Sequence, residues 1–378
     1  MEKAYKSLLL PNKTQEQLIQ KTFGCVRYVY NYFLDLRKTH YETTKEALSF
    51  YDTEKLLTQL KKETTWLKDV DSSALNCALK DLDDAYKNFF RRVKKGEVPG
   101  YPKFKSKHDN NKSYRTRYVN DNIRVLDKNH IRLPKLGRVK VKNLQEIQGR
   151  ILSATVSQVP SGKYYVSLCC TDVEFEPLPK TGKQIGIDLG IKDFLITSDG
   201  EKISGVKSLK QSLEKMAKLQ RKLSRQKKGS GRYNQTRLKI AKLHDHIAHQ
   251  RSYFLHNLST KLIREYDVIC IEDLSVTDMT QDSHFAIDIL DASWSEFVRQ
   301  LEYKAEWYGR EVIKVDKYYA SSQTCSCCGE KSPITKNLKI RKWVCPNCGA
   351  ELDRDVNAAN NILKRGLEIK KERETLIA

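Results

Sequence analysis

The chain begins with two different rhythms of apolar and polar residues. Residues 3–10 (KAYKSLLL) alternate as a strand does and stop at Pro11. Apolar residues then recur at helical spacing in three segments: 15–50, 52–63 and 72–96. The third segment is predicted to begin at Ser72 or Ser73, either of which can cap a helix, and to end at Gly96. We therefore expect residues 15–96 to form a helical unit.

Short alternating segments replace the helical pattern after Val98, where Pro99, Gly100 and Pro102 interrupt it. These segments are NIRVLD, HIRLP, RVKVKN, ILSATVSQV and KYYVSLCC, and they reach about residue 172. They predict a small antiparallel β-barrel or sandwich. Because the N-terminal strand cannot be stable alone, we expect it to join this sheet, which makes the helical unit an insertion.

Strand and helix patterns mix in the second half, which follows a proline-containing segment at 174–183 that we interpret as a linker. The strand patterns are IGIDLGIKDFLITSDGE, VICIEDL and EVIKVD. The helical patterns are LSTKLIREY, SWSEFVRQLEYKAEWYG and DRDVNAANNILKRG. Phe297, Leu301 and Tyr308 share one face of the second helix, and we expect Gly366 to end the third. This half therefore predicts a mixed α/β domain with helices flanking a sheet.

The charge of the chain indicates its class of partner. Its 378 residues include 69 Lys and Arg against 47 Asp and Glu, which gives a net charge of +22. Such an excess attracts polyanions and allows counterion release, so nucleic acid is the predicted partner. The chain has no run of eighteen apolar residues, and its start is too short and polar for a signal peptide. We expect no membrane attachment and a cytosolic location.

Two stretches concentrate the basic residues. Thirteen Lys or Arg and one acid lie between Lys207 and Lys242, and apolar residues at helical spacing predict a helical hairpin with one packed face. The apolar residues of that face are Leu213, Met216, Leu219 and Leu223. The predicted phosphate contacts of the hairpin are Arg221, Lys222, Arg225, Lys227 and Lys228.

The second basic stretch, residues 89–119, interleaves cations with aromatic rings that can stack on unpaired bases. The rings are Phe89, Phe90, Tyr101, Phe104, Tyr114 and Tyr118, and we expect about half of them to be buried. The predicted phosphate contacts here are Lys103, Lys105, Arg115 and Arg117.

Four of the ten cysteines form two CxxC pairs at zinc-ribbon separation. The predicted ligands are Cys325, Cys328, Cys345 and Cys348. Gly329 and Gly349 follow the pairs and permit the tight turns that point backbone amides at the thiolates. Cys327 could replace a neighbour, but the spacing favours Cys325. A closed four-cysteine site has no open coordination position, so we expect a structural zinc. The other cysteines have apolar neighbours and are predicted to be buried thiols: Cys25, Cys77, Cys169, Cys170 and Cys270.

Asp188, Glu272 and Asp355 are the candidate catalytic residues. An unpaired buried carboxylate costs several kcal/mol, so acids at the ends of apolar segments suggest a shared counter-charge. Each residue alone is weak evidence, because strand-end aspartates more often cap turns and because Asp273 is the neighbour of Glu272. Asp353 can cap the last helix and leave Asp355 free. Together three carboxylates could hold two Mg²⁺ ions ~3.5 to 4 Å apart for phosphodiester hydrolysis.

Small residues near these acids carry two further predictions. Gly186 and Gly190 lie on the same side of their strand as Asp188 and predict open space for a metal and a phosphate. Ala358 and Ala359 would let the last helix pack closely on the sheet.

These motifs in combination resemble the TnpB proteins of bacterial insertion sequences, which are RNA-guided DNA endonucleases related to type V CRISPR effectors. The resemblance runs through KAYKSLLLPNKTQ, FGCVRYVYNYFL, PKFKSK, SYRT, IGIDLGIKDF, LSRQKKGS, IEDLSV, DASWSEFVRQLEYKAEWYG, SSQTCSCCG and DRDVNAANNIL. It implies four domains: a β-barrel wedge domain at 1–14 and 97–180, a helical recognition domain at 15–96, a RuvC-like (RNase H-type) nuclease at 181–324 and 349–378, and a zinc ribbon at 325–348.

The resemblance also implies roles and partners. Asp188, Glu272 and Asp355 would be catalytic with Mg²⁺, and the two cysteine pairs would bind zinc. A guide RNA from the transposon end would pair with one strand of double-stranded DNA beside a short DNA motif, in a nucleoid-associated bacterial monomer. Ala320, where relatives usually carry Pro, and Ser7, where they often carry a basic residue, depart from the pattern. Two alternatives stay open: a non-cleaving guide-directed regulator and a transposase that acts directly on element DNA.

Overall fold

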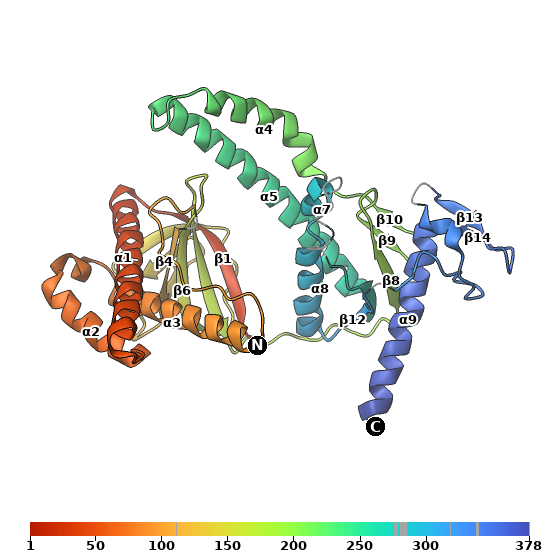
Figure 1. Cartoon of the computed structure of the whole chain (residues 1–378), viewed down its shortest axis with the longest axis horizontal. Helices are drawn as coiled ribbons and strands as arrows, with labels where there is room; N and C mark the ends of the chain where they lie inside the picture. Colours follow the sequence, from red (N-terminus) through yellow and green to blue (C-terminus); the bar gives the residue numbers. More distant parts are fainter. Residues whose placement is uncertain (111, 276–278, 280–285, 318, 338–339, 378) are drawn as a thin grey trace. The chain divides into compact units, whose positions relative to one another are not determined.

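The computed structural model divides the chain into two compact units, Met1–Glu174 and Phe175–Ala378 (Figure 1). It describes residues 1–110, 112–275, 279, 286–317, 319–337 and 340–377. No helix in these described ranges combines the length and the apolar character that crossing a membrane requires. The boundary between the units falls at the start of the predicted linker.

Seven antiparallel strands form the sheet of the first unit, in the order β2-β6-β7-β1-β5-β4-β3. The strands are β1 (Lys3–Leu10), β2 (Lys112–Arg117), β3 (Arg124–Asp127), β4 (His130–Leu133), β5 (Gly137–Lys142), β6 (Arg150–Gln158) and β7 (Tyr164–Thr171). β1 pairs with β7 on one side and β5 on the other, so the expectation that the N-terminal strand joins the later sheet is confirmed. The barrel stays a prediction, because no pairing among the described residues joins β2 to β3.

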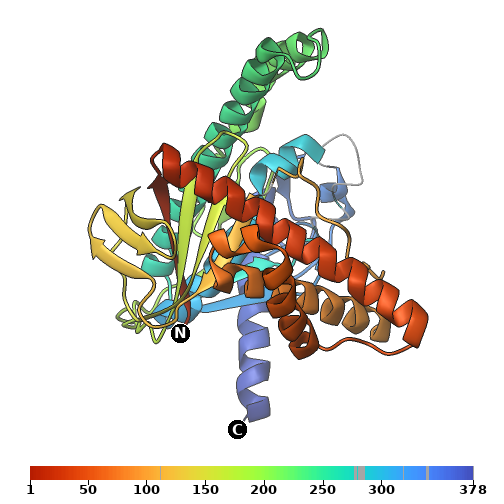
Figure 2. The same ribbon diagram turned by 90° about the vertical axis from the view of Figure 1, so that its left-hand side faces the viewer.

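Three helices and a short 3-10 helix separate β1 from the rest of its sheet: α1 (Lys13–Thr44), α2 (Phe50–Glu63), η1 (Thr65–Asp69) and α3 (Ser72–Lys94). They share a core that includes Phe33, Leu34, Leu75 and Leu79, and Figure 2 shows them grouped together in red to orange. Their ends differ in detail from the sequence prediction. The side chain of Asp71, and not Ser72 or Ser73, caps α3 by accepting the Ser73 N–H. The helix ends as predicted before Gly96, whose φ is +67°.

A mixed sheet with the order β10-β9-β8-β11-β12 is the centre of the second unit. Its strands are β8 (Gln184–Leu189), β9 (Leu195–Thr197), β10 (Lys202–Ile203), β11 (Val268–Glu272) and β12 (Glu311–Val315). β8, β11 and β12 are parallel, and β9 and β10 are antiparallel additions. The helices are α4 (Ser208–Ser224), α5 (Gly231–Glu265), α7 (Ala286–Ala292), α8 (Trp294–Tyr308) and α9 (Arg354–Ile377). The mixed α/β class predicted for this half is confirmed.

The two faces of this sheet carry different helices, with α5 and α8 on one face and α9 on the other (Figure 1). Ile185 and Ile187 of β8 belong to the core with α5 and α8, as do Phe297 and Leu301, which confirms the predicted face of α8. Gly186 points the other way, and a Cβ on it would overlap the carbonyl oxygen of Ala359 in α9. Alternation along the strands therefore decides which residues face α9.

The glycines near Asp188 do not leave open space, so that prediction is wrong. The backbone of α9 fills the space beside Gly186, and a Cβ on Gly190 would lie 2.8 Å from the carbonyl oxygen of Asp193. Close helix packing is the physical reason for Gly186, and the burial of Ala358 and Ala359 on the same helix confirms their predicted role.

Gly366 does not end the last helix, since α9 continues to Ile377. A Cβ on Gly366 would overlap the Sγ of Cys270 in β11. The glycine lets α9 approach β11, although it weakens the helix locally. Sequence position near the end of a periodic pattern suggested a stop, but the contact with a distant strand explains the residue.

Gly366→Ala is expected to destabilise the protein by about 1–3 kcal/mol, because a methyl group added to a filled contact forces backbone shifts. Gly24→Ala is the matched control: Gly24 also lies inside a helix, but nothing stands within 4 Å of its Cβ position. There the change is expected to stabilise by about 0.5–1 kcal/mol through helix propensity. Urea denaturation measures both, and equal effects at the two positions would contradict the packing argument.

A buried ion pair fixes the chain where it enters β8. The guanidinium of Arg310 donates to the carbonyl oxygens of Leu178 and Pro179 and lies 2.6 Å from Asp267. Asp267 in turn accepts the backbone N–H groups of Thr181 and Gly182, and the Thr181 contact is the main reason that its pKa is lowered. The end of the predicted linker is thus held on the second unit, which sets the position of the strand that carries Asp188.

Candidate active site and metal centre

Asp188, Glu272 and Asp355 meet at one edge of the second sheet. Asp188 lies two residues after Gly186 and therefore faces α9, and the β8–β11 register, continued by one residue, places Glu272 opposite it. Asp355 is in the first turn of α9, four residues before Ala359, which packs on Gly186. One helical turn and two strand residues cover similar lengths, so the third acid reaches the level of the other two.

The electrostatics of this site show that burial and negative charge outweigh the positive charge around Asp188. Burial, together with the carboxylates of Glu272 and Asp355, raises the pKa of Asp188 to about 7 against a smaller opposing effect of Arg354 and Arg341. Burial also raises the pKa of Glu272. Glu272 and Asp355 are therefore both close enough to Asp188 to repel its charge, and a divalent cation would supply a counter-charge. Carboxylate oxygens are the ligands that Mg²⁺ prefers, so the donor set fits that ion.

Arg341 holds one of the three acids and was not identified from the sequence. Its Nη1 donates to both carboxylate oxygens of Asp355, at 3.0 and 2.9 Å. Among the described residues, only the four cysteines have ligand atoms that all lie within 4.8 Å of one another, so the three carboxylates do not by themselves form a closed single-ion site. Arg341 could not be identified from the sequence because it lies in the basic segment KIRKW, where its spacing does not distinguish it from the lysines beside it.

The neighbouring acids have other roles. Oδ1 of Asp353 accepts the N–H groups of Asp355 and Val356, as a cap does, and Asp353 also pairs with Lys202 at 2.6 Å. The predicted cap is confirmed. Asp273 is exposed, whereas Glu272 is partly buried, so Glu272 is the acid that the strand turns toward α9.

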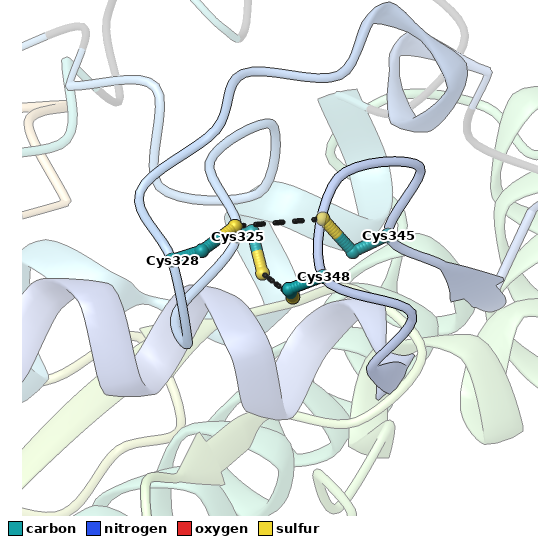
Figure 3. A group of neighbouring side chains, drawn as sticks. All are labelled: Cys325, Cys328, Cys345 and Cys348. Carbon is teal, nitrogen blue, oxygen red and sulfur yellow. Dashed lines mark hydrogen bonds between the residues drawn. The ribbon is translucent and has the colours of Figure 1, made fainter.

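The second site is a cluster of four thiols (Figure 3). The Sγ atoms of Cys325 and Cys348 lie 3.7 Å apart, and those of Cys328 and Cys345 lie 3.6 Å apart. Cys327 is exposed and outside the cluster. This is the arrangement that the CxxC spacing predicted, with the extra thiol excluded.

The cluster has the chemistry of a zinc site. The backbone N–H of Glu330 lowers the pKa of Cys328 to about 6. The backbone N–H of Ala350 acts in the same direction on Cys348, but the crowded sulfurs outweigh it and raise that pKa to about 12. Four thiolates at these distances cannot all ionise without a cation. Zinc favours four thiolate ligands, so the residues fit a structural zinc ion.

Two buried asparagines fasten the first cysteine pair to α9. Asn357 accepts the Ser326 N–H at 2.8 Å and donates to the carbonyl oxygen of Thr324 at 2.7 Å. Asn361 donates to the carbonyl oxygens of Ser321 and Thr324 at 2.8 and 2.6 Å. The metal cluster and the third acid therefore share one helix. In the sequence, the only indication of this role is that the two asparagines lie four residues apart on a predicted helix. Their hydrogen-bond partners are determined by the tertiary fold.

The predicted phosphate contacts of the first unit lie in different environments. Arg115 pairs with Asp81 at 2.7 Å, and Nζ of Lys105 lies 4.0 Å from the centre of the Tyr30 ring, where burial lowers its pKa. Lys103, Lys105 and Arg117 are all exposed, but the ammonium of Lys105 lies against the Tyr30 ring. Lys103 and Arg117 are thus the members of this set most available to a polyanion.

The expectation that about half of the rings in residues 89–119 are buried is wrong. Tyr114 is buried and Phe89 is partly buried. The exposed rings are Phe90, Tyr101, Phe104 and Tyr118. The rings of Phe89 and Tyr101 lie 5.3 Å apart and edge to face, so the loop after α3 folds back on that helix and leaves faces open to stacking.

The predicted basic hairpin is present as α4 and α5, which lie side by side (Figure 1). Met216 packs with Leu243 and Ile247, but Leu213, predicted on the same face, is exposed. α5 is also longer than expected, because it absorbs the separate helix predicted at LSTKLIREY. The predicted contacts at the turn are all exposed: Arg221, Lys222, Arg225, Lys227 and Lys228.

Asp188→Asn is expected to stabilise the protein at pH 8 when Mg²⁺ is omitted. A carboxyl whose pKa is about 7 in the fold, against an ordinary 3.8, gives stability that is complete below pH 4 and lost as the pH rises through 7. The amide removes this dependence and gains up to about 4 kcal/mol at pH 8. Urea denaturation at pH 5 and pH 8 measures the difference, with exposed Asp35→Asn as control. An equal gain at both pH values would contradict the prediction.

Three family models match parts of the chain. They are described as "Helix-turn-helix domain", at residues 1–46, "Probable transposase", at 167–282, and "Cas12f1-like, TNB domain", at 294–362. The first covers β1 and the single continuous helix α1 in this structure. The third covers α8, the cysteine cluster and the start of α9.

Two relatives match almost the whole chain. A protein of Streptomyces pristinaespiralis named "Putative RNA-guided DNA endonuclease" is 36% identical over 97% of this chain and 90% of its own length. InsQ of Escherichia coli (strain K12), with the same description, is 32% identical over 96% of this chain and 92% of its own length. The solved "Structure of the mini-RNA-guided endonuclease CRISPR-Cas_phi3" aligns with 97% of this chain and 92% of its own at 10% identity and a TM-score of 0.46, a likeness too distant to define the fold. From the two full-length relatives, the chain belongs to the TnpB, or OrfB-type, family of insertion-sequence proteins.

Proposed function

We propose that this protein is a Mg²⁺-dependent DNA endonuclease whose target is chosen by a guide RNA. The observation that carries the proposal is the meeting of Asp188, Glu272 and Asp355 on the α9 face of one sheet, where burial and the charges of the other two acids raise the pKa of Asp188. The printed names of the two full-length relatives support the guided nuclease reading. The net charge of +22 supports a polyanionic substrate.

The proposed chemistry is hydrolysis of a phosphodiester. Two Mg²⁺ ions held by the three carboxylates would activate a water molecule and stabilise the leaving oxygen. Asp188 and Glu272 would hold them from adjacent strands, which fixes the spacing of the two carboxylates. Arg341 orients Asp355, and it is the cation that Asp355 must share or release when the site is loaded.

The proposed domains follow the family pattern. Residues 1–14 and 97–180 would form the wedge barrel, 15–96 the recognition domain, 181–324 and 349–378 the RuvC-like nuclease, and 325–348 the zinc ribbon. The three parallel strands with antiparallel additions, covered by helices on both faces, support the nuclease assignment. In this proposal a monomer binds a guide RNA from the transposon end and a double-stranded DNA target.

Two groups of exposed residues would contact the nucleic acids. Lys103, Arg117 and the exposed rings near them suit a strand with unpaired bases, because aromatic faces stack on any base. The cations at the turn of the α4–α5 hairpin suit a phosphate backbone. These contacts are assigned by exposure and charge.

A transposase that acts directly on element DNA is the second candidate, and the family model described as "Probable transposase" favours it. Such an enzyme would cut and join strands without RNA, and the same three acids could serve. A guide-directed regulator that does not cut is disfavoured, because all three carboxylates are present in one site.

Expression together with flanking element DNA tests these alternatives. A guided nuclease should co-purify with a discrete RNA and cut a library of targets with randomised flanks when Mg²⁺ is added, with one short flank sequence enriched among the cut molecules. Strand joining without RNA would instead support the transposase. Binding of guided targets with no cutting would support the regulator.

A further inference from the structure

Arg354 is the first residue of α9 and lies between the cap Asp353 and the third acid, Asp355. Its backbone N–H donates to the carbonyl oxygen of Arg341 at 2.8 Å, which fixes the start of the helix beside the ribbon. Burial and the other two acids raise the pKa of Asp188, and Arg354 opposes that rise more than Arg341 does. The positive charge of Arg354 therefore acts at the candidate active site.

The guanidinium of Arg354 has no partner among the described residues, unlike the cations around it. Arg341 pairs with Asp355, and Lys202 pairs with Asp353. Nε of Arg354 is buried and makes no hydrogen bond. The residue as a whole is partly exposed, and its two terminal nitrogens are not among the buried atoms, so a ligand can reach them. An ionised donor without an acceptor is unfavourable, so this arrangement indicates an acceptor from outside the chain.

The acceptor that suits Arg354 is a phosphate. A metal ion is excluded because its charge has the same sign, and the two acids beside Arg354 in the sequence already have cationic partners. A guanidinium presents its donors as a planar fork, which can bind two oxygens of one phosphate at once. A nucleic-acid strand carries such a group at every nucleotide, so it supplies the ligand in the form that this side chain recognises best.

We propose that Arg354 contacts the phosphodiester that is cut, with its terminal nitrogens on the two non-bridging oxygens. This assignment rests on the proposed nuclease function, which places the reacting phosphate at Asp355 and the two strand acids. There the guanidinium offsets the negative charge that develops on these oxygens as water attacks. Arg341 is not available for this role while its Nη1 donates to both oxygens of Asp355.

Single-turnover cutting of a guided target at saturating Mg²⁺ is the first test. Arg354→Gln is expected to slow cutting about 100-fold or more, as the loss of one preorganised donor to a developing charge does. Arg354→Lys keeps the charge but not the planar fork, so it should recover only part of the rate. Arg373→Gln is the matched control: it removes the same charge from an exposed position near the other end of α9 and should cut as the wild type does.

Binding of a fluorescein-labelled oligothymidylate to the full-length zinc-loaded protein, with Ca²⁺ and without guide RNA, is the second test and does not depend on cutting. Arg354→Gln should weaken binding about 3- to 10-fold, and Arg373→Gln should not. Unchanged binding by Arg354→Gln, together with full recovery of cutting by Arg354→Lys, would show that Arg354 only balances the charge of the acids and would overturn the proposal. Cutting by Arg354→Gln at the wild-type rate would overturn it as well. Weaker binding by Arg354→Gln, in a protein whose wild type never cuts, would refute the nuclease function and support the phosphate contact.

Discussion

Glu272→Gln is expected to reduce Mg²⁺-dependent DNA cutting by about 10³-fold or more while the protein still binds its nucleic acids. The amide keeps the size of the side chain but removes one of three negative charges that would hold the ions, and loss of several kcal/mol of transition-state stabilisation corresponds to this factor. Binding depends instead on surface cations far from this carboxylate in sequence. Cutting of a labelled target and its binding in the absence of Mg²⁺ measure the two properties separately.

Asp273→Asn is the matched control, because it removes the same charge one residue later. Asp273 is exposed, and its side chain alternates to the other side of β11. Cutting should therefore stay within about threefold of wild type. If Asp273→Asn abolished cutting and Glu272→Gln did not, the strand would present the wrong acid to α9 and the proposed site would be incorrect.

The sequence was sufficient for the parts of the fold that depend on local periodicity. Alternation along IGIDLG and VICIE fixed which residues share a face, and that parity is what brings Asp188 and Glu272 together. The two CxxC pairs predicted their own cluster, because knuckle geometry is local. Charge density likewise predicted the hairpin of α4 and α5, although not that α5 would run on to Glu265.

Contacts between distant segments could not be predicted in this way. Gly186 was expected to give open space and Gly366 to end a helix, but both are places where α9 meets a strand far away in sequence. The roles of Arg341 and Asn357 depend on tertiary contacts: Arg341 pairs with Asp355, and Asn357 binds the backbone of the first cysteine pair. A single sequence shows which residue types are present, but the contact partner of each residue is determined by the tertiary fold.

Cys345→Ser is expected to release the zinc and to lower DNA cutting at least about 100-fold. A structural zinc contributes about 10–16 kcal/mol in small zinc domains, so the ribbon should not hold its shape with three thiolates. The effect should reach the active site, because Asn357 and Asn361 fasten the first cysteine pair to α9, and Arg341, from the same ribbon, holds Asp355. Zinc content by mass spectrometry and cutting of a guided target measure the two effects.

Hydrogen exchange distinguishes this coupling from general unfolding. In Cys345→Ser, backbone amides of the first turns of α9 should exchange faster, while those of β8 and β11 should keep their protection, because the core with α5 and α8 does not include the ribbon. Cys327→Ser is the control: its thiol is exposed and outside the cluster, so zinc, protection and cutting should all be retained. Loss of zinc from Cys327→Ser with retention in Cys345→Ser would reverse the ligand assignment. Unchanged hydrogen exchange in α9 after zinc loss would show that the ribbon does not stabilise the part of α9 that carries Asp355.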